Sequence, residues 1–348
     1  MGGHGVNGSS SNGHSRDRPR NGRPLASVSL DADDLWAYLR THGDPSWERR
    51  PSYLARFFPR VLDLLDEAGM KITFFIVGED AARDESAAAM QPLVARGHEV
   101  GNHSFRHECW IHLYSADQLN EELTRAEQAI EAATGERPRG FRGPGFSWSP
   151  TVLETLATLG YRYDATTFPT FIGPLARRYF LASSKLEGEE LEQRRHLFGA
   201  FSDGFRSLRP FYWKAAGGRN VLEIPVTTVP IAKVPFHMSY LLYIGGRSEA
   251  LMMAYLRGAL ASCRALGVEP SFLLHPLDFL GGDEVSELSF FPGMQIDTAT
   301  KVRLARRVLG VLGEEFECVP MGVHADAIEG RGGVGVREVK KIPSWGAA

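Results

Sequence analysis

The stretch "VSLDADDLW", residues 28–36, decides how the rest of the chain is interpreted. Its start belongs to a longer run, "LASVSLD" (25–31), whose composition is typical of a buried strand. Three carboxylates follow within four residues, those of Asp31, Asp33 and Asp34. Because negative charge at the end of a buried strand is costly without a partner, the stretch predicts a cation or a basic side chain beside it.

Segments with strand-like and helix-like patterns alternate after this stretch. The segments expected to contain strands are 71–77, 98–104, 140–147, 161–167, 221–229, 271–276 and 316–322. The segments expected to be helical are 53–69, 87–97, 115–135, 149–160 and 298–314. This alternation predicts an α/β protein with a mostly parallel sheet, closed or nearly closed into a barrel with helices outside. In such a barrel, reactive residues lie at the carboxyl ends of the strands.

Composition excludes several classes of protein. The chain has 348 residues, of which 43% are hydrophobic, so it can bury one large core or two smaller ones. A net charge of −3, without a basic motif that contains interleaved aromatic residues, argues against nucleic-acid binding. Three widely separated cysteines predict no disulfide framework and favour a reducing compartment.

Both ends of the chain are expected to lie outside the barrel domain, which would occupy residues 25–327. Residues 1–24 are rich in Gly, Ser, Asn and Arg and predict a disordered leader, and residues 328–348 predict a flexible tail. The leader contains no apolar run of the kind found in a secretory signal, and no segment approaches the length of a membrane span. We therefore expect a cytoplasmic protein.

Residues 168–219 interrupt the alternation. This segment is rich in aromatic and arginine side chains and is too long for an ordinary connection. We expect a partly helical insertion over the mouth of the barrel. Three interpretations stay open: a packed excursion that completes the barrel wall, a lid that stacks on sugar rings, or a face that contacts a membrane surface.

Two histidines follow one of the expected strands, in "GHEVGNHSFRH". His103 and His107 are four residues apart, so one helical turn would place both imidazoles on the same face. Two histidines and a carboxylate make an open metal site that leaves room for water and substrate. Ordinary surface or core histidines are the alternative for this pair alone.

Two more elements carry polar residues at expected strand ends. In "GFRGPGFSWSP", Arg142 precedes a glycine-rich loop whose backbone could approach a ligand closely. In "SFLLHPLDF", His275 leaves an apolar strand directly before a proline. Taken singly, the first is also compatible with a turn and a surface arginine, and the second with a structural histidine.

Together and in this order, these four elements resemble the polysaccharide deacetylase family, the NodB-type carbohydrate esterases. The family's first motif, a strand ending in two Asp, appears in "SLDADD" as the variant in which one residue separates them. The second motif appears as "HSFRH" (103–107), the third as "RGP" (142–144) and the last as "LLH" (273–275). The resemblance covers about residues 25–325 and implies a distorted, often incomplete, (β/α) TIM-like barrel whose metal is usually zinc.

The resemblance also implies a role for each matching residue. The residues that would bind the metal are Asp33, His103 and His107. Asp31 would be the general base that deprotonates the water, and Arg142 would hold it in place. Asp34 as a ligand in place of Asp33 stays an alternative.

For the other side of the substrate, the resemblance implies that His275 is the general acid for the leaving amine. The residues expected to contact the substrate are Gly145, Leu273 and Trp148, and the backbone N–H of Gly145 would help to hold the oxyanion. The family's fourth motif, which orients the acid and the base arginine, has no clear counterpart. Asp164 and Asp278 are the two candidates for orienting His275.

The expected activity is metal-dependent removal of an N-acetyl group from an amino sugar in a glycan, a glycoconjugate or a lipid-linked precursor. The chemistry agrees, because amide hydrolysis needs an activated water, a stabilised oxyanion and a proton for the leaving nitrogen. The alternative keeps the machinery and changes the amide to an N-formyl sugar or a small cyclic ureide. A non-catalytic carbohydrate-binding relative would normally have lost a ligand or Asp31. The sequence does not name the sugar, the physiological metal or the oligomeric state.

Overall fold

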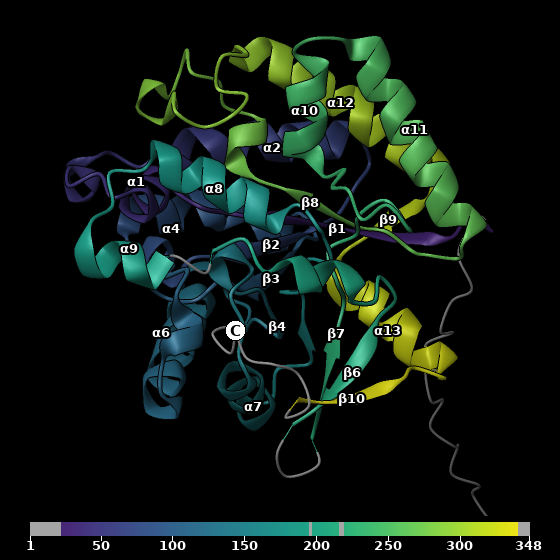
Figure 1. Ribbon diagram of the computed structural model, residues 1–348, viewed down its shortest axis with the longest axis horizontal. Coiled ribbons are helices and arrows are strands. Elements are labelled where there is room, and N and C mark those ends of the chain that lie inside the picture. Colours follow the sequence, from purple (N-terminus) through teal and green to yellow (C-terminus); the bar gives the residue numbers. More distant parts are fainter. Residues whose placement is uncertain (1–21, 195–196, 216–218, 340–348) are drawn as a thin grey trace, which may run out of the picture.

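The computed structural model describes residues 22–194, 197–215 and 219–339 (Figure 1). The strands are β1 (Leu25–Asp31), β2 (Thr73–Ile76), β3 (Glu99–Asn102), β4 (Gly140–Phe141), β5 (Tyr163–Asp164), β6 (Phe211–Lys214), β7 (Asn220–Glu223), β8 (Ser271–Leu274), β9 (Glu317–Val319) and β10 (Val336–Glu338). The α-helices are α1 (Leu35–His42), α2 (Leu54–Glu67), α3 (Gly78–Ala81), α4 (Asp84–Met90), α5 (Pro92–Ala95), α6 (Ala116–Thr134), α7 (Pro150–Leu159), α8 (Gly173–Ser183), α9 (Gly188–Arg194), α10 (Met238–Gly245), α11 (Glu249–Ala265), α12 (Thr298–Glu315) and α13 (Met321–Arg331).

The strands form one sheet in the order β10-β6-β7-β5-β4-β3-β2-β1-β8, with β9 beside the first residues of β1. Neighbouring strands are parallel except for the antiparallel pair β6 and β7. Among the described residues, no pairing joins β8 to β10, so the barrel stays open between them. The predicted fold class, a distorted or incomplete (β/α) barrel, is confirmed.

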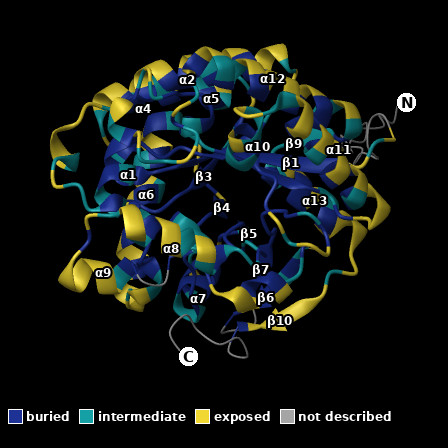
Figure 2. Ribbon diagram, turned by 45° about the horizontal axis from the view of Figure 1, so that its top comes forward, coloured by how far each residue is buried: buried dark blue, intermediate teal, exposed yellow. Residues whose placement is uncertain are grey.

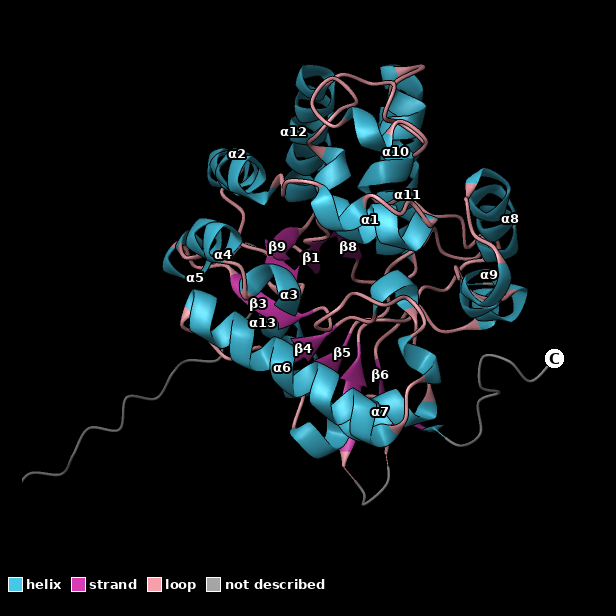
Figure 3. Ribbon diagram, turned by 90° about the vertical axis from the view of Figure 1, so that its left-hand side faces the viewer, coloured by secondary structure: helices cyan, strands magenta, loops and turns pink. Residues whose placement is uncertain are grey.

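β1 shows how the sequence separates the two faces of the sheet. Its side chains in the large outer core are those of Ala26, Val28 and Leu30. Helices α2, α10, α11 and α12 cover this face, with their outer sides exposed (Figures 2 and 3). The alternate residues Ser27, Ser29 and Asp31 face the interior of the barrel, because successive side chains of a strand point to opposite faces. β1 therefore delivers Asp31 to the interior.

α13 packs inside the barrel, next to β6 and β7 (Figure 1), and no prediction had placed a helix there. Its side chains meet Phe75 of β2 and Tyr163 of β5 in an apolar cluster. They are Met321, Ala325 and Ile328. After α13, β10 pairs in parallel with β6. The prediction of a flexible tail from residue 328 is therefore wrong up to Val339, because tertiary pairing orders a polar, glycine-rich segment.

The structure describes only a few residues of the expected leader. Residues 1–21 and 340–348, which fall in the expected leader and tail, lie outside the described residues. Residues 22–24 are described, and the Pro24 carbonyl accepts a hydrogen bond from the Glu317 N–H at 2.9 Å. Within the described ranges, no helix combines the length and the hydropathy that a membrane crossing needs.

The insertion expected at residues 168–219 is partly helical, as predicted, and contains α8, α9 and a 3₁₀ helix at Phe201–Phe205. Arg194 anchors it to the barrel. This buried guanidinium donates to the Arg40 carbonyl at 3.3 Å and lies 4.2 Å from the centre of the Trp110 ring. The last part of the segment is not an insertion, because residues 211–214 form β6 of the sheet.

Candidate metal centre and active site

The predicted reactive residues meet at the carboxyl ends of four strands, which form the mouth of the barrel. Asp31 ends β1, and His103 directly follows β3. Arg142 directly follows β4, and His275 directly follows β8. Since β8, β1, β2, β3 and β4 run parallel as successive neighbours, these ends lie at one edge of the sheet.

Asp33, His103 and His107 form a compact cluster of buried ligand atoms. Asp33 Oδ1 lies 3.0 Å from His107 Nε2 and 3.2 Å from His103 Nε2. The ligand atoms of the three residues all lie within 4.8 Å of one another. Among the described residues, neither Asp33 Oδ1 nor either ring nitrogen of His107 has a hydrogen-bond partner, although all are buried. Buried lone pairs that converge without hydrogen bonds fit a divalent metal ion.

The surroundings of His103 leave its Nε2 available to a metal. Its Nδ1 lies 2.6 Å from the carbonyl oxygen of Arg142, so Nδ1 carries the proton and donates it. Such a hydrogen bond commonly fixes the tautomer of a metal-binding histidine. Burial lowers the pKa of His103, but the carboxylates of Asp31 and Asp33 outweigh it and raise that pKa above its usual value. A bound metal ion would take the place of the second proton.

The two histidines are not on one helical turn, so that prediction is wrong. Residues 103–108 form a loop in which Ser104 and His107 have positive φ angles of 62° and 52°. Ser104 Oγ accepts a hydrogen bond from the His107 N–H at 3.0 Å. The Glu122 carboxylate, from α6, accepts two more backbone N–H groups of the loop at 3.0 and 2.6 Å. Glu122 supports the site and carried no sequence signal, because it lies in an ordinary amphipathic helix.

Arg142 is a fully buried cation with a partner for each part of its guanidinium. It donates to Asp31 Oδ1 at 2.6 Å and to Ser29 Oγ at 2.9 Å. Its Nε donates to the carbonyl of Ala165 at 3.0 Å, and the group lies 4.4 Å from the centre of the Phe75 ring. These contacts fix one oxygen of Asp31 and leave the other free.

The free oxygen, Asp31 Oδ2, faces the middle of the site. It lies 4.0 Å from His103 Nε2 on one side and 4.0 Å from His275 Nε2 on the other. Both distances exceed hydrogen-bond length, so these atoms make no direct hydrogen bond, and a water or a reacting group placed beside them could bridge each pair. The side chain of His275 is 19% exposed, whereas that of Asp31 is 5% exposed, so His275 stands nearer the opening.

Asp34 does not belong to the ligand cluster. It is the N-cap of α1, and its Oδ1 accepts hydrogen bonds from the N–H groups of Leu35 at 2.7 Å and Tyr53 at 3.2 Å. The alternative in which Asp34 replaces Asp33 is therefore wrong. The Tyr53 hydroxyl in turn donates to the Asp33 carbonyl at 2.5 Å. Burial and then the nearby Asp33 carboxylate raise the pKa of Tyr38 well above its usual value, so this phenol stays protonated beside the cluster.

Asp278, and not Asp164, supports His275. Ser239 Oγ donates to Asp278 Oδ1 at 2.7 Å and lies 3.5 Å from His275 Nδ1. Asp278 Oδ2 accepts the backbone N–H of His275 at 2.7 Å. Asp164 instead shares a buried contact with Glu223, and burial together with this second carboxyl raises the pKa of Asp164 well above its usual value. Among the described residues, Asp164 makes no hydrogen bond with His275 and instead accepts one from the Thr166 hydroxyl.

Two predicted substrate contacts lie beside the reactive groups. Gly145 is half-buried in the loop after β4 with φ 59°, and a Cβ there would lie 3.1 Å from the sulfur of Cys109. This close approach and the positive φ both favour glycine. Leu273 precedes His275 by two residues, so it shares its face of β8, and it is fully buried. A role in substrate binding stays a prediction for both.

The third predicted substrate contact, Trp148, packs against a second tryptophan. It is buried, and its ring stacks on that of Trp213 with 5.5 Å between the centroids. Trp213 of β6 is itself buried and donates from Nε1 to Glu223 at 2.9 Å. Trp148 also lines a small cavity together with Phe146 and Phe198. A role in substrate binding therefore stays a prediction for Trp148 as well.

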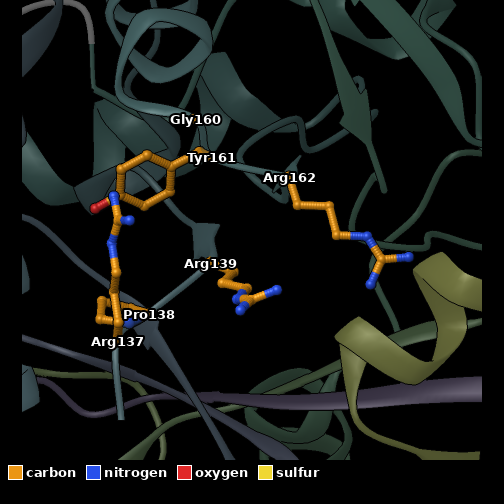
Figure 4. Close-up of a pocket in the computed structure, with 6 residues that line it drawn as sticks. All are labelled: Arg137, Pro138, Arg139, Gly160, Tyr161 and Arg162. Atoms are coloured by element: carbon orange, nitrogen blue, oxygen red, sulfur yellow. The ribbon is translucent and has the colours of Figure 1, made fainter.

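A surface pocket of about 380 Å³ lies at the opposite end of the strands, where β4 and β5 begin (Figure 4). Its lining includes Arg137, Arg139 and Arg162. Arg137 pairs with Glu127 at 2.8 Å, and Arg162 pairs with carboxylates of α13. Two of the three charges are therefore neutralised, and the pocket contains none of the predicted reactive residues.

Comparison with known proteins agrees with the motifs. Residues 33–163 match the profile of the polysaccharide deacetylase family. A chitooligosaccharide deacetylase from Bradyrhizobium is 32% identical over 134 residues, which are 36% of this chain and 59% of that protein. A peptidoglycan deacetylase from Helicobacter pylori is 28% identical over 147 residues, which are 40% of this chain and 48% of that protein. The chain thus spans about half to three fifths of the length of these relatives.

The fold has a counterpart among solved structures. A crystal structure from Mycobacterium smegmatis, assigned as a polysaccharide deacetylase, superposes with a TM-score of 0.57 and covers 90% of this chain and 93% of that one. At 20% identity this likeness shows the fold alone. The matched profile includes Asp33, His103, His107 and Arg142, whereas Asp31 and His275 lie outside it. Residues 33–163 of this chain are therefore similar to the polysaccharide deacetylase family, and the whole chain has the fold of a solved structure assigned to it.

Proposed function

We propose that this chain is a metal-dependent hydrolase that removes an N-acetyl group from an amino sugar, with Zn²⁺ as the metal. One observation carries the proposal. The ligand cluster of Asp33, His103 and His107, with its unpartnered atoms, adjoins the free oxygen of Asp31, and His275 faces that oxygen from the other side. Separate metal-binding and proton-transferring groups at one mouth are what amide hydrolysis needs.

A bound metal would supply Lewis acidity, which polarises the acyl carbonyl and lowers the pKa of a coordinated water toward ~7. Asp31 would accept the proton of the attacking water at Oδ2, since Oδ1 is occupied by Arg142. The backbone N–H of Gly145 would stabilise the oxyanion, because Gly145 lies in the loop that follows β4, three residues after Arg142.

His275 would return a proton to the leaving nitrogen from Nε2. Ser239 and Asp278 support this role, because the Ser239 hydroxyl donates to Asp278 and leaves a lone pair toward His275 Nδ1. The Nδ1–H of a charged imidazole would be held there while Nε2–H points into the site. A positioned acid or base contributes about 10²–10⁴-fold in rate.

The substrate class is part of the proposal. The matched relatives are named for chitooligosaccharide and peptidoglycan deacetylation, and both substrates contain N-acetylated amino sugars. We infer the same class here, in a glycan, a glycoconjugate or a lipid-linked precursor. A cytoplasmic location is also proposed, and the three unpaired cysteines, Cys109, Cys263 and Cys318, support a reducing compartment.

Acetate release by the purified, zinc-loaded chain tests the function. The substrates are N-acetylglucosamine oligomers of increasing length, their N-formyl analogues and a cyclic ureide. We expect acetate from the N-acetylated sugars, and a rate about 10²–10⁴-fold lower for Asp31→Asn. The variant should keep its metal. Retained metal would also show that the site still folds after Arg142 has lost the charge of its partner Asp31.

Two results would contradict the proposal. Release of ammonia or carbamate from the ureide, without acetate from any sugar, would assign the same machinery to a different amide. Loss of the metal from Asp31→Asn would make Asp31 a ligand, so that another group would have to act as the base.

A further inference from the structure

Apolar side chains protrude from three separate elements near the mouth. We call them the apolar face, defined by Leu175 and Tyr179 of α8, Phe201 and Phe205 of the 3₁₀ helix, and Ile231 in the turn before α10. Their exposed fractions run from 55% at Tyr179 to 83% at Ile231. Large apolar side chains that are exposed together mark an interaction surface more often than isolated ones do.

The aromatic part of this face is held in place. The ring of Phe171 lies 4.9 Å from Phe201 and 5.0 Å from Phe205, measured between centroids. The turn that carries Ile231 is tied to the same region, because Lys233 donates from Nζ to the carbonyl of Arg206 at 2.6 Å. The side chains of the apolar face therefore protrude from segments that are packed against one another.

α8 has apolar residues on both of its sides. Phe180 is buried against the insertion, as expected for the inner side. Leu175, Tyr179 and Ala182 recur at intervals of four and three residues, so they share the outer side, together with Arg178. A helix whose solvent-facing side carries large apolar residues lacks a partner that covers it.

Basic residues border the apolar face. Residues 168–183 and 229–236 contain Arg177, Arg178 and Lys233 and no acidic residue. The 3₁₀ helix contains one acidic residue, Asp203, whose charge is paired with Arg206 at 2.7 Å. Arg178 is exposed, and the described part of the chain contains no ion pair with it. Arg177 donates to the Gly199 carbonyl at 3.3 Å, so it has a structural contact as well. Positive charge beside protruding apolar side chains matches the headgroup region of an anionic lipid surface.

The apolar face lies at the same end of the barrel as the reactive residues. α8 begins after the carboxyl end of β5, the turn at Ile231 lies after the carboxyl end of β7, and the 3₁₀ helix leads into β6, whose first residue pairs with the last of β7. The insertion also packs directly on the loop of Gly145, because Phe146 and Phe198 line one small cavity. A surface bound there would meet the protein beside the mouth.

We propose that the apolar face docks on a lipid membrane surface. The aliphatic side chains of Leu175 and Ile231 have no ring to stack on a sugar, which argues against a glycan platform. They protrude from separate elements, and lipid chains can close around each of them. The inference rests on this surface alone and holds whether or not the site is a deacetylase.

Vesicle co-sedimentation of the full chain tests the proposal. The probes are vesicles of phosphatidylcholine alone and of phosphatidylcholine with one third phosphatidylglycerol. We expect binding to the anionic vesicles, reduced at least tenfold in the double variant Phe205→Ser with Ile231→Ser. Arg178→Glu should weaken binding to anionic vesicles more than to neutral ones. All substituted side chains are exposed, so folding and activity on a soluble substrate should not change.

The matched control is Leu251→Ser, since Leu251 of α11 is 60% exposed and lies outside the apolar face. It should bind vesicles like the unaltered chain. No sedimentation above the lipid-free level, or an equal loss in Leu251→Ser, would overturn the proposal. Dimerisation or binding to an insoluble glycan that Phe205→Ser with Ile231→Ser abolishes, without vesicle binding, would assign the face to that partner and also overturn it.

Discussion

Each end of the barrel carries histidine, carboxylate and arginine side chains in contact, and the two groups differ in how their polar atoms are satisfied. At the amino end, His324 of α13 contacts Ser27 Oγ at 3.0 Å through Nδ1 and Glu269 at 3.0 Å through Nε2. Arg331 donates to both oxygens of Glu269, at 2.7 and 2.5 Å. Every ring nitrogen and carboxylate oxygen in this group has a partner.

At the mouth, the same residue types leave atoms without partners. Asp33 Oδ1 and both ring nitrogens of His107 are buried and make no hydrogen bond in the part of the chain that the structure describes. Unsatisfied buried polar atoms cost free energy, so they persist where a ligand completes them. Residue types alone therefore do not distinguish a binding site from a structural clamp, whereas the hydrogen-bond inventory does.

The largest expected effect is loss of the metal from the mouth. The double variant His103→Ala with His107→Ala removes two of three ligands, so bound zinc measured by elemental analysis should fall to near zero and acetate release with it. His324→Ala is the matched control at the amino end and should keep its zinc. Unchanged zinc in the double variant would show that the metal does not bind at the mouth, and the contrast between the two ends would then have no functional meaning.

His275→Ala should lower the rate on N-acetylated sugars by about 10²–10⁴-fold and leave bound zinc unchanged. The loss should be much smaller for an activated aryl ester, whose leaving group needs no proton. Initial rates on an amide and an ester, measured with the same enzyme preparation, give the ratio directly. Equal losses on both would show that His275 positions the substrate and does not act as the acid.

A smaller effect, on stability, is expected at the amino end from Glu269→Gln. Burial would raise the pKa of Glu269, but hydrogen bonds from His324 and Arg331 lower it to about 2. The folded-state pKa is thus below the unfolded one, so this stabilisation is present near pH 7 and is lost as the pH falls from about 5 through 2. Discounted for partial exposure, we expect a loss of about 2 kcal/mol at pH 7.

Urea unfolding at pH 7 and at pH 3 measures this effect, and the difference between the variant and the unaltered chain should shrink at the lower pH. The control is Glu121→Gln, an exposed glutamate on α6. A difference that is the same at both pH values would show that the ionised carboxylate is not what stabilises the clamp.

The smallest effect is expected at Arg139. This arginine lies at the amino end of the barrel, only three residues before Arg142 at the mouth, so the pair compares the two ends directly. Arg139 precedes β4 and is exposed at the pocket of Figure 4, whereas Arg142 follows β4 and is fully buried at the mouth. Arg139→Ala should change activity by less than twofold and the free energy of unfolding by less than about 0.5 kcal/mol. Arg142→Ala should abolish most activity. A large loss of activity in Arg139→Ala would give the amino end a role in function.

Much of this site could be predicted from the sequence, because each reactive residue directly follows an apolar strand or sits in a short motif. Parallel strands bring such positions to one edge whatever the details of the helices. The loop of His103 and His107 could not be predicted, because its shape depends on Glu122 from a helix that begins nine residues later. The exclusion of Asp34 from the metal cluster could not be predicted either, because it depends on a hydrogen bond from Tyr53, 19 residues away in the chain.

The fold was predicted less completely than the site. α11 was not predicted, although its sequence has the pattern of an amphipathic helix. Ser248 is its N-cap, and its buried residues include 252, 256, 259 and 263. α13 and β10 were harder to predict. The buried side of α13 includes His324, whose polarity hides the helical period, and β10 consists of exposed residues. Only contacts with distant strands explain why these segments are ordered.

The position of α13 also sets an order of events during protein synthesis. The sulfur of Met321 lies 3.7 Å from Arg142 Nη2, a contact between residues 179 positions apart in the chain. A ribosome adds residues one after another from the N-terminus, so β1 to β8 all emerge before this helix does. Until α13 docks, the guanidinium that holds Asp31 has an open side. A nascent chain therefore completes the surroundings of Asp31 and Arg142 only at a late, non-local step, and contacts of this kind form slowly.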